Sequence, residues 1–220
     1  MQTNLADFIR DTPVGREADA ILRSCVHCGF CTATCPTFQL LGDELDGPRG
    51  RIYLIKQMLE GGLVSETTQL HLDRCLSCRS CETTCPSGVR YHRLLEIGRE
   101  VVERKVPRPL AARVMRFLLC EALPRNWIFR PAVRVGQAMR PLLPRALADK
   151  VPPAAARAAR PWPRAAGHRR RMIALAGCVQ PTLTPATNAA TARVLDRLGI
   201  ELAEVPAAAC CGALRYHLQA

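Results

Sequence analysis

The chain has 220 residues, of which 48% are hydrophobic and 12 are cysteines, so it can form one large or two small globular domains. Its first residues, MQTNLADFIRDTP, lack the basic and apolar regions of a signal peptide, and no apolar run approaches the roughly 18 residues of a transmembrane helix. We therefore expect a reducing, cytoplasmic compartment, where clustered cysteines more often bind metal than form disulfides.

Two cysteine runs stand out in the first half of the chain. CVHCGFCTATCP (25–36) and CLSCRSCETTCP (75–86) have the same spacing, Cys-x₂-Cys-x₂-Cys-x₃-Cys-Pro, at an offset of 50 residues. This spacing matches bacterial two-cluster ferredoxins, in which the fourth cysteine of each run binds the other run's cluster. The sequence therefore predicts two [4Fe–4S] clusters with crossed ligands, Cys25, Cys28, Cys31 and Cys85 for the first and Cys75, Cys78, Cys81 and Cys35 for the second.

The alternative for these runs is a pair of Cys₄ zinc sites, but such sites usually use paired Cys-x₂-Cys knuckles. His27 and His71 lie near the runs, and we do not include them among the ligands. Gly29 allows the backbone to pass close to a cluster. Pro36 and Pro86 follow the last cysteine of each run, where a new helix could begin.

The segments around the runs have the periodicity of helices. Apolar residues recur on one face of READAILRSC (16–25), RGRIYLIKQMLEGG (49–62) and YHRLLEIGREVVERK (91–105). We therefore expect a mainly α fold, with a helical two-cluster ferredoxin domain over residues 1–106. Arg49 and Arg51 lie where the second of these helices begins, and the sequence leaves open whether they neutralise a cluster or face water.

A basic segment follows, over residues 107–171. The wider window 99–171 holds 18 Lys and Arg against 4 Asp and Glu, whereas the rest of the chain holds 13 against 15. The segment reads as short amphipathic helical pieces and then a Pro/Ala/Arg-rich connector that begins near residue 151. This composition would suit binding to an anionic membrane surface or to an acidic partner. The alternative is that the segment is a solvated tether between two domains. It carries no nucleic-acid recognition motif. We interpret Cys120 as a buried apolar thiol.

Residues 172–220 have the pattern of a βαβ unit. A short strand ends near Cys178, a helix follows Thr184–Pro185, and a second strand, IELAEVP, precedes Cys210 and Cys211. Parallel strands end at the same edge of a sheet, so we expect the three thiols to converge there. Burial of the three thiols is the alternative interpretation, and the sequence leaves open whether they hold a third cluster.

Several stretches together resemble the family of iron–sulfur subunits of bacterial glycolate oxidases, also called glycolate dehydrogenases. The resemblance covers nearly the whole chain and is weakest over 107–171; it rests on the two cysteine runs, GDELDGPRGRIYLIKQ, CPSGVRYH, GCVQPTLTPATNAATARVLDRLGI and CCGALRYHL. It implies the same eight ligands as the spacing does. It also implies that 172–220 begins a cysteine-rich CCG-type domain, which family members follow with a second one. We therefore expect the N-terminal half of a longer protein, with 172–220 poorly ordered alone.

The resemblance also implies a function. An FAD-containing partner subunit would oxidise glycolate to glyoxylate, and this chain, without a substrate site of its own, would pass the electrons toward a quinone-type acceptor. A second flavin-domain subunit and peripheral contact with the inner membrane are compatible with it, whereas nucleic-acid binding is not expected. The alternatives are the equivalent subunit of a lactate, glycerol-3-phosphate or heterodisulfide oxidoreductase, and a zinc-stabilised basic protein.

Overall fold

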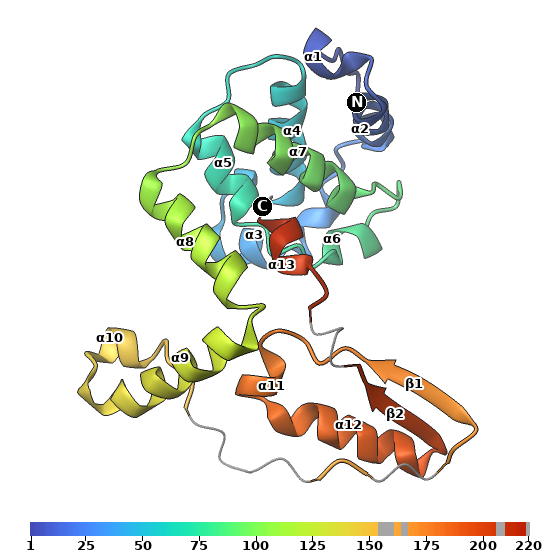
Figure 1. Cartoon of the computed structure of the whole chain (residues 1–220). Helices are drawn as coiled ribbons and strands as arrows, with labels where there is room; N and C mark the ends of the chain where they lie inside the picture. The colour runs from blue at the N-terminus through green and yellow to red at the C-terminus, as the bar shows by residue number, and fades with distance from the viewer. Residues whose placement is uncertain (154–160, 164–166, 206–209, 219–220) are drawn as a thin grey trace. The chain divides into compact units, whose positions relative to one another are not determined.

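The structure, a computed structural model, describes residues 1–153, 161–163, 167–205 and 210–218 (Figure 1). The chain forms two compact units, Met1–Pro109 and Leu110–Leu218. The first is helical and the second combines helices with a two-stranded parallel sheet, which confirms the expected fold class. The division into parts 1–106, 107–171 and 172–220 stays a prediction.

The first unit is built from helices of four to fifteen residues. They are α1 (Asp7–Arg10), α2 (Pro13–Ser24), α3 (Pro36–Leu41), α4 (Pro48–Leu59), α5 (Glu66–Asp73), α6 (Ser80–Thr83) and α7 (Tyr91–Lys105), with 3₁₀ turns η1 (Phe30–Thr32) and η2 (Glu44–Asp46). The three helices expected from periodicity are α2, α4 and α7. Helix α5 was not anticipated.

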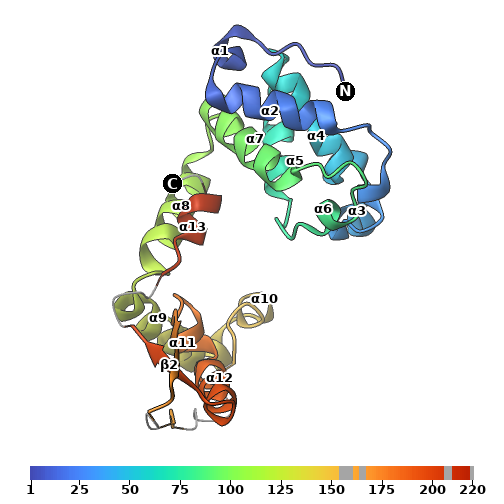
Figure 2. The same ribbon diagram turned by 90° about the vertical axis from the view of Figure 1, so that its right-hand side faces the viewer.

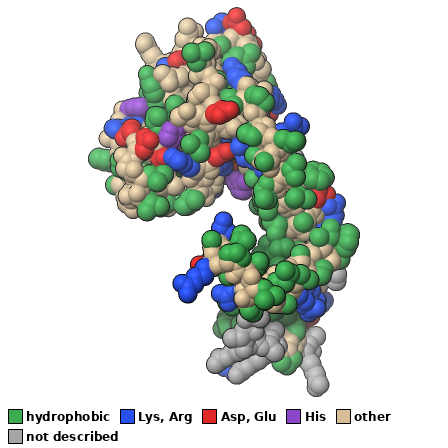
Figure 3. All heavy atoms as spheres, turned by 90° about the vertical axis from the view of Figure 1, so that its left-hand side faces the viewer, with side chains coloured by type: hydrophobic (Ala, Val, Ile, Leu, Met, Phe, Trp, Pro, Cys, Tyr) green, Lys and Arg blue, Asp and Glu red, His purple; other side chains and the backbone are tan. Residues whose placement is uncertain are grey.

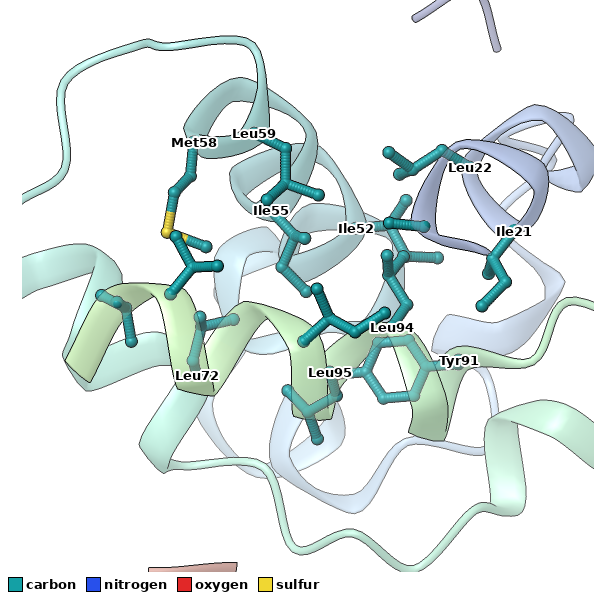
Figure 4. Close-up of a cluster of buried hydrophobic side chains, with 14 of the residues drawn as sticks. Ile21, Leu22, Ile52, Ile55, Met58, Leu59, Leu72, Tyr91, Leu94 and Leu95 are labelled. Atoms are coloured by element: carbon teal, nitrogen blue, oxygen red, sulfur yellow. The ribbon is translucent and has the colours of Figure 1, made fainter. Parts of the chain in front are cut away.

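The core of this unit lies between α4 and α7, with α2 against one end (Figure 4). Ile52 and Ile55 of α4 face Leu94 and Leu95 of α7, and all four side chains are buried. Gly98 lets the two helices approach, because a Cβ atom at this position would lie 2.7 Å from Cγ1 of Ile55. The apolar stripes seen in the sequence thus form one packed interface.

A fully buried carboxylate ties the loop after the first run to α4 and α5. Asp46 accepts hydrogen bonds from Arg51 Nη2 (3.3 Å) and Arg74 Nη1 (2.8 Å), and its Oδ1 lies 3.0 Å from His71 Nδ1. Burial alone would raise the pKa of this carboxyl, but His71 and Arg74 hold it below its ordinary value through hydrogen bonds and charge. Arg51, also buried, donates to the backbone oxygen of His71 (2.7 Å).

The second unit contains the sheet and the helices around it. Its elements are α8 (Leu110–Ala122), α9 (Asn126–Met139), η3 (Arg140–Leu142), α10 (Arg145–Ala148), β1 (Arg170–Ala174), α11 (Gln180–Leu183), α12 (Pro185–Arg197), β2 (Ile200–Glu204) and α13 (Ala213–His217). β1 pairs with β2 in parallel, from Arg170 opposite Ile200 to Ala174 opposite Glu204. The expected βαβ unit is present, and Cys120 is buried as predicted. Much of the expected connector, 154–160 and 164–166, lies outside the described residues.

Helices α8 and α9 expose many large apolar side chains. Phe117, Leu118 and Trp127 are more than half exposed, and exposed arginines such as Arg130 and Arg134 lie among them. Figure 3 shows hydrophobic and basic side chains side by side on the surface. None of the helices within the described residues combines the length and hydrophobicity needed to cross a bilayer.

The Asp46 network gives a prediction about stability. Replacing Asp46 with Asn removes the charge that compensates buried Arg51, so the free energy of unfolding should fall by roughly 3–5 kcal/mol, as when a buried ion pair loses one partner. Urea unfolding of the cluster-loaded chain, followed by circular dichroism, measures it. The control is Asp7→Asn, which removes a 94% exposed carboxylate paired with Arg10 and should cost less than about 1 kcal/mol. Equal effects of the two substitutions would show that the buried network does not stabilise the fold.

Candidate iron–sulfur cluster sites

The two cysteine runs form loops with the same backbone shape. Each loop has left-handed residues at the same two repeat positions, His27 (φ 60°) and Gly29 (φ 86°) in the first and Ser77 (φ 54°) and Arg79 (φ 60°) in the second. A short helical turn, η1 or α6, follows each. Three non-glycine residues in this sparsely populated region are typical of a loop held around a ligand.

A cavity lies inside the first loop. Four of the cysteines on its wall are the set predicted for the first cluster, and a fifth, Cys81, also reaches it: Cys25, Cys28, Cys31, Cys81 and Cys85. Cys85 belongs to the other run and comes from the segment after α6. The fold therefore brings the last cysteine of the second run to the first loop.

A second cavity lies inside the second loop. Its wall contains the four cysteines predicted for the second cluster, Cys35, Cys75, Cys78 and Cys81. Cys81, Pro48 and Tyr91 border both cavities, so the two sites share a wall. Thr84 Oγ1 donates to Thr34 Oγ1 (3.1 Å), which joins the two runs at equivalent positions. In Figure 2, α3 and α6 lie at the same end of the first unit.

The crowding of thiols in these cavities fits a bound iron–sulfur cluster. Burial, with Cys25 and other cysteines nearby, raises the pKa of Cys31 to about 11. Burial and Cys75 raise the pKa of Cys81 to about 12. Thiolates placed so closely repel one another unless a cation lies between them, and soft thiolate sets suit iron–sulfur clusters and zinc. When bound, a [4Fe–4S] cluster would supply a one-electron acceptor at each site.

His27 is a second indication that the first cavity fits a bound iron–sulfur cluster. It borders this cavity, and its Nε2 atom is buried and has no hydrogen-bond partner among the described residues. Burial and the charge of Arg49 lower the pKa of His27, which favours the neutral ring. A cluster sulfur would give this atom a partner.

The two arginines of the sequence DGPRGR lie at different cavities. Arg49 borders the first, where its side chain is 37% exposed and donates from Nε to Glu44 (2.6 Å). Arg51 borders the second, where it is buried and paired with Asp46. Arg79, which is 62% exposed, also borders the second cavity, so among these three arginines Arg51 alone is shielded from water.

Several hydrogen bonds reach cysteine sulfurs. The Tyr91 hydroxyl donates to Cys75 Sγ (3.6 Å), and the Val89 N–H donates to Cys85 Sγ (3.4 Å). Ser80 lowers the pKa of the Cys78 thiol through its hydroxyl and backbone N–H. Donors to thiolate ligands orient them and tune the metal.

Sequence reasoning missed some of these supporting residues. Tyr91 was assigned only to an apolar face, although a buried tyrosine hydroxyl usually has a partner. Arg99 donates to the backbone oxygen of Cys75 (2.8 Å) and to Ser77 Oγ (3.1 Å), and nothing local in the sequence indicates this role. His71, which was not included among the predicted ligands, is buried against Asp46.

The two prolines that follow the runs behave differently. Pro36 is the first residue of α3, as the sequence suggested. Pro86 begins no helix, so that expectation was wrong: a turn follows it, and α7 begins only at Tyr91. The Val89 N–H that a helix would have used points instead at Cys85 Sγ.

The three cysteines of the second unit lie near the ends of the strands. Cys178 Sγ is 3.5 Å from Cys210 Sγ, and Cys211 is exposed. Burial and the neighbouring Cys210 raise the pKa of Cys178. Two of the thiols thus meet as expected, and all three are at least partly accessible, which excludes three buried cysteines.

Comparison with family models gives two matches. Residues 21–89 match a 4Fe-4S dicluster domain, and residues 173–219 match a cysteine-rich domain of the CCG type. The first match spans both cysteine runs. The second spans the βαβ unit and its three cysteines.

Individual relatives agree with these models. The whole chain is 60% identical to the glycolate oxidase iron-sulfur subunit of Escherichia coli, covering 54% of that protein. Over 89% of the chain it is 34% identical to a probable glycolate oxidase iron-sulfur subunit of Bacillus subtilis, covering 50% of it. A ferredoxin:CoB-CoM heterodisulfide reductase subunit of Methanosarcina mazei is 29% identical over 44% of the chain and is covered to 56%.

The chain thus spans about half the length of these relatives. Its first half matches a 4Fe-4S dicluster domain and its last part a cysteine-rich domain, and over its whole length it is similar to glycolate oxidase iron–sulfur subunits.

Proposed function

We propose that the eight cysteines of the two runs bind two [4Fe–4S] clusters with crossed ligands. The grouping of the thiols into two cavities, each with three cysteines of one run and the last of the other, is the observation that carries this proposal. The first cluster takes Cys25, Cys28, Cys31 and Cys85, and the second takes Cys75, Cys78, Cys81 and Cys35. Cys81 borders both cavities, but Cys75 and Cys78, which precede it in the same run, border only the second. We therefore assign Cys81 to the second cluster.

We further propose that this chain carries electrons within a glycolate-oxidising complex. Its likeness over the full chain to the Escherichia coli protein supports this role, although the chain spans about half of that protein. A flavin gives up electrons in pairs, and two clusters can accept them singly. The sequence has no Gly-x-Gly-x-x-Gly dinucleotide motif, so we place FAD and the substrate chemistry on a partner subunit.

A heterodisulfide-type role is the second candidate. It is favoured only by the partial likeness of the first half to the heterodisulfide reductase protein of Methanosarcina mazei. The alignment with the Escherichia coli glycolate oxidase subunit covers the whole chain, including residues 173–219, and favours the first candidate.

Crossed ligation can be tested with single substitutions. Cys85→Ser should damage the cluster of the first loop, because it removes the fourth ligand there, and Cys35→Ser should damage the other. EPR spectra of the reduced, reconstituted variants measure which signal is lost. Cys120→Ser, which changes a buried thiol in α8, should leave both signals intact. Crossed ligation would be contradicted if Cys85→Ser damaged the same cluster as Cys75→Ser, that of the second loop, and left the cluster of the first loop intact.

The electron-transfer role predicts a defined dependence on partner and substrate. The chain co-purified with its flavin subunit should show visible absorption that glycolate bleaches anaerobically, whereas the chain alone should be bleached by dithionite but not by glycolate. Bleaching by lactate or glycerol 3-phosphate and not by glycolate would favour the corresponding alternative subunit. A colourless protein that contains zinc would contradict the cluster proposal itself.

We also propose that the chain works in the cytoplasm and that the basic surface of α8 and α9 docks the flavin subunit or the anionic inner membrane. Binding to the co-purified subunit or to phosphatidylglycerol vesicles should weaken as salt rises, because exposed charges are screened. Replacing Arg130 and Arg134 with Gln should weaken it further. Replacing Arg10 and Arg16 with Gln removes the same charge from the first unit and serves as the control. Equal loss with both pairs, or preferred binding to duplex DNA, would contradict the proposal.

A further inference from the structure

One cysteine sulfur of the second set accepts a hydrogen bond from a side-chain hydroxyl, and the described residues give the first set no equivalent. The Tyr91 hydroxyl donates to Cys75 Sγ (3.6 Å). Tyr91 lies beyond the second run, and different structure follows the two runs: α3 begins at Pro36, whereas α7 begins only at Tyr91. The difference between the two sites therefore arises after the repeated segment.

Tyr91 is well held for this role. It is the first residue of α7, its ring is buried in the core beside Leu94 and Leu95, and it borders both cavities (Figure 4). Its hydroxyl nevertheless donates to a sulfur of the second set only. The loop that carries Cys75 is fixed in turn by Arg99, which donates to the Cys75 backbone oxygen.

Other donors do not explain a difference between the sites. The Val89 N–H reaches Cys85 in the first cavity, so the first site also has a donor, but it is a backbone group. Thr37 Oγ1 lies 3.2 Å from Cys35 Sγ, but it donates to the backbone oxygen of Asp46 at 2.8 Å. Among the described residues, the side-chain hydroxyl donor specific to one site is therefore Tyr91.

We propose that the hydroxyl of Tyr91 selectively raises the reduction potential of the cluster held by Cys75, Cys78, Cys81 and Cys35. A hydrogen bond to a ligand sulfur stabilises the electron-rich reduced cluster more than the oxidised one, so it raises the potential. Tyr91 thereby sets the driving force for an electron that leaves one cluster and enters the other. This inference rests on the proposed binding of two clusters. Tyr91 is not a ligand; it acts through the sulfur of a ligand, Cys75.

The test is a potentiometric titration of the reconstituted full chain, followed by EPR. Tyr91→Phe should lower one of the two midpoint potentials and leave the other in place. At the wild-type midpoint of that cluster the ratio of reduced to oxidised protein should fall by roughly tenfold, which for a one-electron couple equals about 59 mV. Tyr91→Phe keeps the ring in the core, and the unchanged potential of the other cluster in the same sample shows that the fold is intact.

A matched control sharpens the result. Tyr53→Phe removes a tyrosine hydroxyl from a half-exposed position outside both cavities and should shift neither potential. No shift with Tyr91→Phe, or equal shifts of both potentials, would overturn the inference. Wild-type protein that binds no cluster would instead contradict the proposed function.

Discussion

The first unit is organised around one constraint, the repulsion among thiolates gathered in two adjoining cavities. Each cavity takes its last cysteine from the other run, so segments 50 residues apart in the sequence must meet. Buried thiols in this density resist ionisation, as the raised pKa values of Cys31 and Cys81 indicate. A bound iron–sulfur cluster would remove this resistance, because its iron atoms bind the thiolate form and compensate its charge.

The helices provide a rigid frame for these cavities. The core between α4 and α7 lies directly beside them, and Tyr91 belongs to both the core and the cavity walls. The Asp46 network also holds the second cavity in place. Arg51 connects this network to the cavity wall, and Thr37 connects it to the segment after Cys35. Apolar packing and polar contacts therefore hold the same loops.

The repeat is symmetric in its ligands and asymmetric in what surrounds them. The loops share left-handed residues at equivalent positions, but the Tyr91 hydroxyl donates to a sulfur of the second set. The arginines also differ, since Arg49 is partly exposed and Arg51 is buried. Two sites with the same ligand set can thus present different electrostatic surroundings, which is what a directed path for electrons requires.

The sequence by itself was enough to predict how the eight cysteines of the runs group into the two sets that line the cavities. It was also enough to predict the helices α2, α4 and α7, and the βαβ unit near the second group of cysteines. These depend on local spacing and periodicity, which are read directly from neighbouring residues. Only the tertiary structure decided the roles of Asp46, Arg99 and Tyr91, because a buried polar side chain is defined by partners that are distant in sequence. The start of α7 at Tyr91, instead of after Pro86, was decided in the same way, since the Val89 N–H donates to a sulfur atom and not to a helix. Local pattern therefore indicates which cysteines are candidate ligands, and long-range packing determines how each of them is held.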